Sequence, residues 1–136
     1  MLRELDLDMS RIHFIGAQDY EDYIKLLQTT SAHIYASYPF VLSWSLIESL
    51  SCGTPLICSS TEPVLEVIKD NYNGLLYDFY DIDMMVEKIE FALDNKDKME
   101  EIRANARNTA IEKFNLTDKL AEQIYYIQNI IKNSKA

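Results

Sequence analysis

Short apolar runs alternate with amphipathic stretches along the first half of the chain. The first run, RIHFIG, is rich in β-forming residues and ends at a glycine, and the stretch DYEDYIKLLQTT after it has apolar residues at helical spacing. The apolar runs are 11–16, 32–37, 54–60 and 75–79, and the helical stretches between them are 19–30, 43–53 and 62–74. The pattern predicts four strands that alternate with three helices.

Three longer helical segments are predicted after Asp81, at 81–94, 96–113 and 117–133. The last one starts at Thr117, a residue suited to an N-cap, and has an apolar stripe. The stripe consists of Leu120, Ile124, Ile127 and Ile131. Together these elements predict an α/β fold with a Rossmann-like, doubly wound parallel sheet and a helical C-terminal tail. Ligands of such sheets bind at the carboxyl ends of the strands.

Composition narrows the class of protein. The 136 residues suffice for one domain with a real core. There are 22 acidic and 13 basic residues, which give a net charge of −9 and argue against binding to nucleic acid or to an anionic membrane surface. No apolar run is long enough for a membrane span, and the charged opening MLRELDLDMSRIHF is unlike a secretory signal, so a cytoplasmic location is expected. Cys52 and Cys58 are predicted to be small buried apolar residues rather than a disulfide or metal pair.

Four stretches in order carry a family resemblance: HFIG followed by a helix, YPFVLSWSLIESLSCGTPLICSS, TEPVLEVIKDNYNGLLYD and the long helical tail. They resemble the carboxyl-terminal half of the large family of retaining glycosyltransferases with the two-domain GT-B fold, which includes glycogen and sucrose synthases. The resemblance implies that residues 1–115 are a nucleotide-sugar donor-binding domain without its first strands, and that residues 116–136 are a C-terminal helix.

Members of this family transfer a sugar from a nucleotide diphosphate sugar to an acceptor with retention, in polysaccharide or glycoconjugate biosynthesis. The resemblance therefore implies a nucleotide sugar as donor substrate, an N-terminal acceptor domain of the same protein as partner, and no metal or cofactor. Because the family's basic pair for the diphosphate precedes the stretches found here, the chain is expected to be a fragment that is inactive alone. A nucleotide-sugar epimerase of the same fold and a non-catalytic flavodoxin-like binding module are the alternatives.

Glu48 is the strongest candidate site residue. It matches a family glutamate that binds the ribose hydroxyls of the donor, and a carboxylate can accept hydrogen bonds from both hydroxyls of a cis-diol. Two structural explanations compete with this role. Glu48 is nearly opposite the apolar face of its helix, as a solvated glutamate would be, and it follows Ser45 at the spacing of a capping box.

Other positions match the family's site more loosely. Ser43, Trp44 and Ser45 begin the same helix, whose amides are candidates for the diphosphate, although Ser43 and Ser45 also suit simple N-caps. The resemblance places the nucleotide base near the main chain of Ile15, Gly16 and Ala17.

The donor sugar is expected near Phe40, Thr61 and Glu62. Phe40 stands where the family has the first glutamate of a pair whose second member matches Glu48, so the chain either contacts the sugar differently or has lost activity. Glu66 either approaches the donor or lies on the helix surface. The sequence specifies neither a catalytic residue nor the base, sugar or acceptor.

Overall fold

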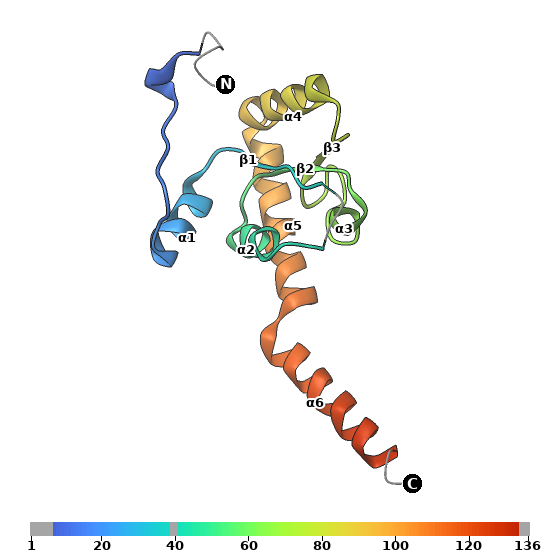
Figure 1. Ribbon diagram of the computed structural model, residues 1–136. Coiled ribbons are helices and arrows are strands. Elements are labelled where there is room, and N and C mark those ends of the chain that lie inside the picture. The colour runs from blue at the N-terminus through green and yellow to red at the C-terminus, as the bar shows by residue number, and fades with distance from the viewer. Residues whose placement is uncertain (1–6, 39–40, 134–136) are drawn as a thin grey trace.

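A three-stranded parallel sheet forms the centre of the fold in the computed structural model, which describes residues 7–38 and 41–133 (Figure 1). Its strands are β1 (His33–Tyr35), β2 (Leu56–Ser59) and β3 (Leu75–Tyr77), in the order β1-β2-β3. In the register of the sheet, Ile34 lies opposite Ile57 and Cys58 lies opposite Leu76. Helices make the connections, as parallel neighbours require.

Helices account for most of the remaining described residues. A short 3-10 helix, η2 (Met9–Arg11), precedes α1 (Tyr20–Thr29), and α2 (Trp44–Cys52) and α3 (Glu62–Leu65) follow the first two strands. The carboxyl-terminal part contains α4 (Ile82–Asp94), α5 (Lys96–Phe114) and α6 (Leu116–Asn133). Within the described residues, no helix combines the length and the apolar character that crossing a membrane requires.

Both faces of the sheet are covered at its central strand, β2. Successive side chains of a strand point to opposite faces. Leu56 and Cys58 pack with the core side chains of α2, α3 and α5, whereas Ile57 packs with those of α4 and with Met99 and Ile102 of α5. All four residues of β2 are buried, as expected for the central strand of a parallel sheet. The predicted doubly wound α/β architecture is confirmed.

The predicted strand at 11–16 is wrong. Ile12 has extended backbone, but these residues pair with no strand in the described part of the chain. Phe14 and Ile15 are 73% and 55% exposed. A local apolar pattern can favour an extended backbone, but a strand also needs a neighbour with which to form hydrogen bonds. The described sheet therefore has three strands instead of four.

The predicted helix at 62–74 forms only as the single turn of α3. Asn73, which is buried, explains where the backbone turns away. Its Oδ1 accepts a hydrogen bond from the Lys69 N–H (2.7 Å), and its Nδ2 donates to the Val67 carbonyl and to Thr109 Oγ1 of α5 (both 3.0 Å). The side chain thus takes backbone partners that a longer helix would use, and it fixes the turn to α5.

Gly53 ends α2 as predicted, with a left-handed φ of 63°. A Cβ at this position would lie 3.3 Å from the carbonyl oxygen of Arg103 in α5. The Arg103 Nε in turn donates a 2.8 Å hydrogen bond to the Gly53 carbonyl. The glycine therefore allows the end of α2 to approach the backbone of α5 closely, and this contact fixes the position of the helix that carries Glu48.

α6 extends away from the rest of the fold as a separate rod (Figure 1). None of its side chains, all within the described residues, is buried. The predicted helix is confirmed, but the predicted N-cap is wrong. Asn115 caps the helix, because its Oδ1 accepts a 2.9 Å hydrogen bond from the Thr117 N–H.

Candidate functional site

The loops that follow the three strands lie along one edge of the sheet, as predicted. Ser59 at the end of β2 holds two of them together. Its Oγ accepts a hydrogen bond from the Ser37 N–H and donates one to the Ser37 carbonyl, both at 3.0 Å. The Ser60 N–H donates to the Tyr77 carbonyl at the end of β3 (2.8 Å). Hydrogen bonds between loops therefore hold together the edge of the sheet on which the candidate site lies.

Ser43 begins the site on α2. It is the N-cap, and its Oγ accepts a 3.1 Å hydrogen bond from the Ser45 N–H. Its carbonyl accepts a bond from the Leu46 N–H (3.2 Å). The N-cap explanation of Ser43 is thus confirmed, and the capping box between Ser45 and Glu48 is wrong because Ser45 lies inside the helix. Two amides of the first turn are already used, which reduces the number that an anion could bind.

Trp44 is the most exposed of the diphosphate candidates, at 84% of its surface. Ser43 and Ser45 are partly buried, and their hydroxyls form a hydrogen bond with each other. The first turn of α2 thus presents an indole and a pair of mutually bonded hydroxyls. It retains the partial positive charge of a helix N-terminus.

Glu48 lies one turn further along α2 and faces α1. It is partly buried and lines a groove of about 450 Å³ between the two helices, together with Tyr20, Ile24, Ile47 and Trp44. The side of α2 that carries Glu48 is therefore only partly open to solvent. It forms one wall of a half-open groove with aromatic and aliphatic neighbours, and Arg107 of α5 also lines this groove.

Two tyrosines of α1 hold the Glu48 carboxylate. The negative charge of Glu48 raises the pKa of Tyr20, with burial and a side-chain hydrogen bond to Glu48 as further causes. Burial raises the pKa of Tyr23, and the charge of Glu48 and a hydrogen bond to it raise it further. A tyrosinate beside a negative charge is unfavourable, so the loss of either hydroxyl proton is disfavoured. The Glu48 carboxylate therefore lies close to two hydroxyl groups.

The base-binding candidates precede α1 on the same side of α2. Gly16 makes a turn with a φ of 65°, and a Cβ there would meet no atom within 4 Å. The side chain of Gln18 donates hydrogen bonds to the carbonyls of Ile15 and Ala17. A base that contacts this segment must therefore use other atoms or displace Gln18.

The donor-sugar candidates differ in their surroundings. Thr61 is only 6% exposed, and its Oγ1 has no hydrogen-bond partner within the described residues. Glu62 begins α3 and is exposed, as is Glu66 at its end. Phe40 lies outside the described residues. The structure thus places Thr61 and Glu62 at the predicted edge without showing a contact between them and Glu48.

Comparison with known proteins identifies the family. The protein family described as "Glycosyl transferases group 1" matches residues 6–109 of the chain. The chain belongs to this family. A glycosyltransferase of Methanocaldococcus jannaschii, itself uncharacterized, is 30% identical over 112 residues, which are 82% of this chain and 29% of that protein.

Solved structures with the same fold include members of the GT-B class. Sucrose-phosphate synthase of Thermosynechococcus elongatus matches 92% of this chain with a TM-score of 0.80 at 22% identity, over 31% of its own length. Anabaena HepE, solved with UDP-glucose, matches 92% of the chain with a TM-score of 0.80 at 20% identity, over 35% of its own length. This group 1 glycosyltransferase chain thus spans about a third of these proteins, and its predicted GT-B carboxyl-terminal fold is confirmed.

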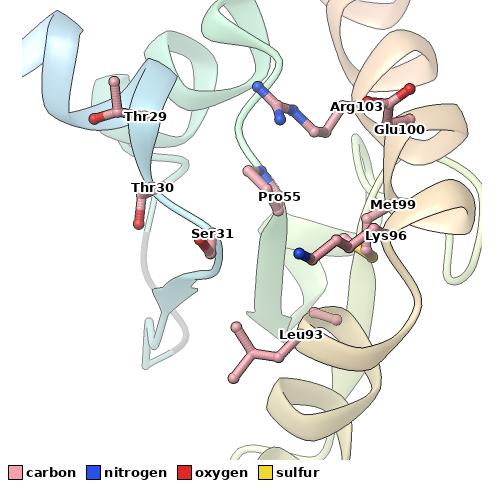
Figure 2. A pocket seen from close by; sticks show the side chains of 10 residues that line it. Thr29, Thr30, Ser31, Pro55, Leu93, Lys96, Met99, Glu100 and Arg103 are labelled. Atoms are coloured by element: carbon pink, nitrogen blue, oxygen red, sulfur yellow. The ribbon is translucent and has the colours of Figure 1, made fainter.

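A second pocket of this glycosyltransferase chain lies at the opposite edge of the sheet (Figure 2). It has a volume of about 410 Å³ and is lined by side chains near the amino ends of β1 and β2, including Ser31 and Pro55, with Lys96 and Arg103 of α5 opposite. The guanidinium of Arg103 is already bound to the carbonyls of Gly53 and Gln28. Ligands of this fold class bind at the other edge, so this pocket is not part of the candidate site.

The cysteines lie near the site without forming a pair. Cys58 is buried in β2, and burial raises its pKa to about 12. Cys52 is partly buried at the end of α2, and both are free thiols. They pack as small side chains, as predicted.

The sequence pattern does not identify Tyr20 and Tyr23 as part of the candidate site. Tyr20 and Tyr23 fit the helical spacing of α1, and this spacing predicts packing only. Their role depends on how α1 crosses α2, which no local pattern specifies.

Proposed function

We propose that this chain is the donor-binding domain of a glycosyltransferase that moves a sugar from a nucleotide diphosphate sugar to an acceptor, with retention. The observation that carries the proposal is Glu48, a half-buried carboxylate in the groove between α1 and α2. The acceptor domain and the basic contacts to the diphosphate are proposed to belong to the remaining two-thirds of a parent protein. The chain alone is then inactive.

The chemistry of Glu48 supports a ribose contact. An ionised carboxylate offers about four acceptor positions. Even if the nearby hydroxyls of Tyr20 and Tyr23 each took one, two would stay available. The remaining positions suit the two hydroxyls of a ribose, and such charge-assisted bonds are short and strong. The complex of HepE with UDP-glucose supports a nucleotide sugar as the ligand class.

The first turn of α2 is proposed to face the diphosphate. Its helix N-terminus favours negative charge, and Trp44 stands exposed beside it. The turn cannot bind a diphosphate well alone, because Ser43 already uses two of its amides and the chain carries a net charge of −9. Stabilising the leaving diphosphate as charge develops would therefore depend on basic groups of the parent protein.

The test is a titration of the isotope-labelled chain with UDP, GDP and ADP, monitored by amide chemical shifts. One nucleotide is expected to shift residues near Gly16 and from Ser43 to Glu48. Glu48→Ala should weaken its binding about 10- to 100-fold, as expected for the loss of a hydrogen bond to a charged group. Glu90→Ala, which removes an exposed glutamate of α4 outside the groove, is the matched control.

The same nucleotide titration on the parent protein can contradict the proposal. If none of the three nucleotides binds the parent, or if the Glu48→Ala and Glu90→Ala variants of the parent bind a nucleotide equally well, the proposal is wrong. Product analysis on the parent separates transfer to an acceptor from epimerisation.

A further inference from the structure

Three aromatic rings from two loops meet at the carboxyl edge of the sheet. Tyr38 follows β1, and Phe79 and Tyr80 follow β3. The ring centroids of Tyr38 and Phe79 are 5.6 Å apart with an interplanar angle of 74°, and those of Phe79 and Tyr80 are 5.0 Å apart at 88°. We call these three residues the aromatic cluster.

The outer rings of the aromatic cluster are open to solvent. Tyr38 is 65% exposed and Tyr80 is 77% exposed, whereas the central Phe79 is partly buried. Edge-to-face contacts are a favourable arrangement for aromatic pairs. Because the ring planes are nearly perpendicular, Phe79 does not stack flat on either tyrosine. Each tyrosine therefore keeps ring surface on which a flat ligand could stack.

The turn between β3 and α4 fixes the position of Tyr80. The Tyr80 N–H donates a 3.0 Å hydrogen bond to Asp78 Oδ1, and the Asp81 N–H donates to the Asp78 carbonyl (2.9 Å). Asp81 Oδ1 then caps α4 by accepting from the Met84 N–H (2.8 Å). The backbone that carries the exposed ring is thus held in place before any ligand binds, which lowers the ordering cost of binding.

The charge beside Tyr80 restricts the class of ligand. A hollow of about 480 Å³ is lined by Tyr80, Ile82 and three carboxylates, those of Asp78, Asp81 and Asp83. No Lys or Arg lines it, and all of its lining residues belong to the described part of the chain. Three negative charges repel a phosphate or a nucleotide. Carboxylates accept hydrogen bonds, so an uncharged ligand rich in hydroxyls remains favourable.

We propose that the aromatic cluster binds an uncharged sugar ring of the acceptor, at the point where an acceptor held by the other domain of the parent protein reaches this edge of the sheet. One face of a pyranose carries C–H groups, which pack on the negative face of an aromatic ring, while its hydroxyls point outward to acceptors. The donor's own sugar is bonded directly to a diphosphate, which the carboxylates disfavour. The assignment to the acceptor rests on the proposed function, whereas the sugar-binding property of the cluster does not.

The test follows the ring resonances of the tyrosines in the 136-residue chain during titration with four methyl glycosides. The probes are the methyl glycosides of glucose, galactose, mannose and N-acetylglucosamine, at millimolar concentrations. At least one is expected to shift the rings of Tyr38 and Tyr80. Tyr80→Ala should weaken its binding about fivefold, the size expected for one aromatic contact. Tyr125→Ala, at a similarly exposed tyrosine of α6, should leave binding unchanged.

Two further arms separate this inference from the proposed function. Tyr80→Ala should leave the affinity for UDP, GDP or ADP unchanged, and Glu48→Ala should leave the affinity for the glycoside unchanged. Glucose 1-phosphate should bind more weakly than methyl glucoside. The inference is overturned if none of the four glycosides shifts these rings, or if Tyr125→Ala weakens binding as much as Tyr80→Ala. Equal or tighter binding of glucose 1-phosphate would overturn the assignment to an uncharged acceptor.

Discussion

Tyr20 lies beside Glu48 across the groove between α1 and α2, and the charge of the Glu48 carboxylate is the largest cause of the raised pKa of Tyr20. Tyr23 lies one turn further along α1, and its pKa is raised by burial first and then by the charge of the same carboxylate. Two hydroxyls on one helix thus lie close to an acid on the next. If Glu48 binds ribose, the tyrosines position the carboxylate for it.

Replacing either tyrosine by phenylalanine should therefore weaken nucleotide binding. Tyr20→Phe and Tyr23→Phe each remove a hydroxyl that lies close to Glu48, and if that hydroxyl positions the carboxylate we expect affinity to fall about 2- to 10-fold. The preference for a ribonucleotide over its 2′-deoxy form should fall as well, because an unrestrained carboxylate matches the diol less well. Calorimetric titration with both nucleotides checks this. A Tyr125→Phe control, on α6, should change neither quantity, and an unchanged ribose preference in both α1 variants would contradict the positioning role.

The tyrosine pKa values should depend on the charge of Glu48. Glu48→Gln removes the negative charge, so both tyrosines should titrate closer to pH 10 than they do in the wild-type chain. A raised tyrosine pKa means that the folded state holds its proton more tightly than the unfolded state. The associated stability is complete below pH 10 and is lost as the pH rises through the raised folded pKa. Ring chemical shifts recorded from pH 9 upward measure the change, and identical curves for Glu48→Gln and wild type would argue against direct contact.

Gly53 and Gly16 offer a matched test of the α2–α5 contact. Both have left-handed φ, at 63° and 65°, so alanine introduces about 1–2 kcal/mol of backbone strain at either position. Only Gly53→Ala also places a Cβ 3.3 Å from a backbone oxygen. We expect it to lower the free energy of unfolding by about 1–3 kcal/mol more than Gly16→Ala does. Urea denaturation measures the free energy of unfolding of both variants. Equal losses would show that the backbone of α5 moves away from the added Cβ at little energetic cost.

His33 should make the fold sensitive to acid. Burial lowers its pKa from 6.5, because the charged imidazole is poorly solvated in β1. The unfolded chain then binds more protons than the folded chain, so this contribution to stability is full above pH 6.5 and is lost as the pH falls through the lowered folded pKa. His33→Gln should reduce the loss of stability on going from neutral to acidic pH. Thermal unfolding across that range, with the exposed His13→Gln as control, measures the difference.

Removing α6 should leave the rest of the fold intact. None of the side chains between Leu116 and Asn133 is buried, so a chain that ends at Asn115 loses little packing. We expect its thermal midpoint to match that of the full chain and its solubility to rise, because exposed apolar side chains of α6 are removed. A marked fall in the midpoint would mean that α6 packs on the domain in solution.

The sequence predicts elements where one local rule dominates. The helix at 82–94 and the glycine end of α2 follow from spacing and φ preference alone. The strand at 11–16 fails because pairing depends on distant residues, and the helix at 62–74 fails because the Asn73 side chain competes for its backbone. Glu48 is reachable through family resemblance, whereas the tyrosines beside it and the aromatic cluster arise only when separate elements meet. The local sequence pattern does not specify which separate elements come into contact.

The dependence of α2 on α5 also bears on how the chain is made. Leu46 and Leu50 share a core with Ala106 and Ala110, and Arg103 reaches back over 50 residues to the Gly53 carbonyl. Synthesis proceeds from the N-terminus, so α2 is made before the helix that supports it. Until α5 is made, the two leucines lack two of their core neighbours, and the Gly53 carbonyl lacks its partner Arg103. The segment that carries Ser43 and Glu48 therefore completes its packing only after residues more than 40 positions further along the chain have been added.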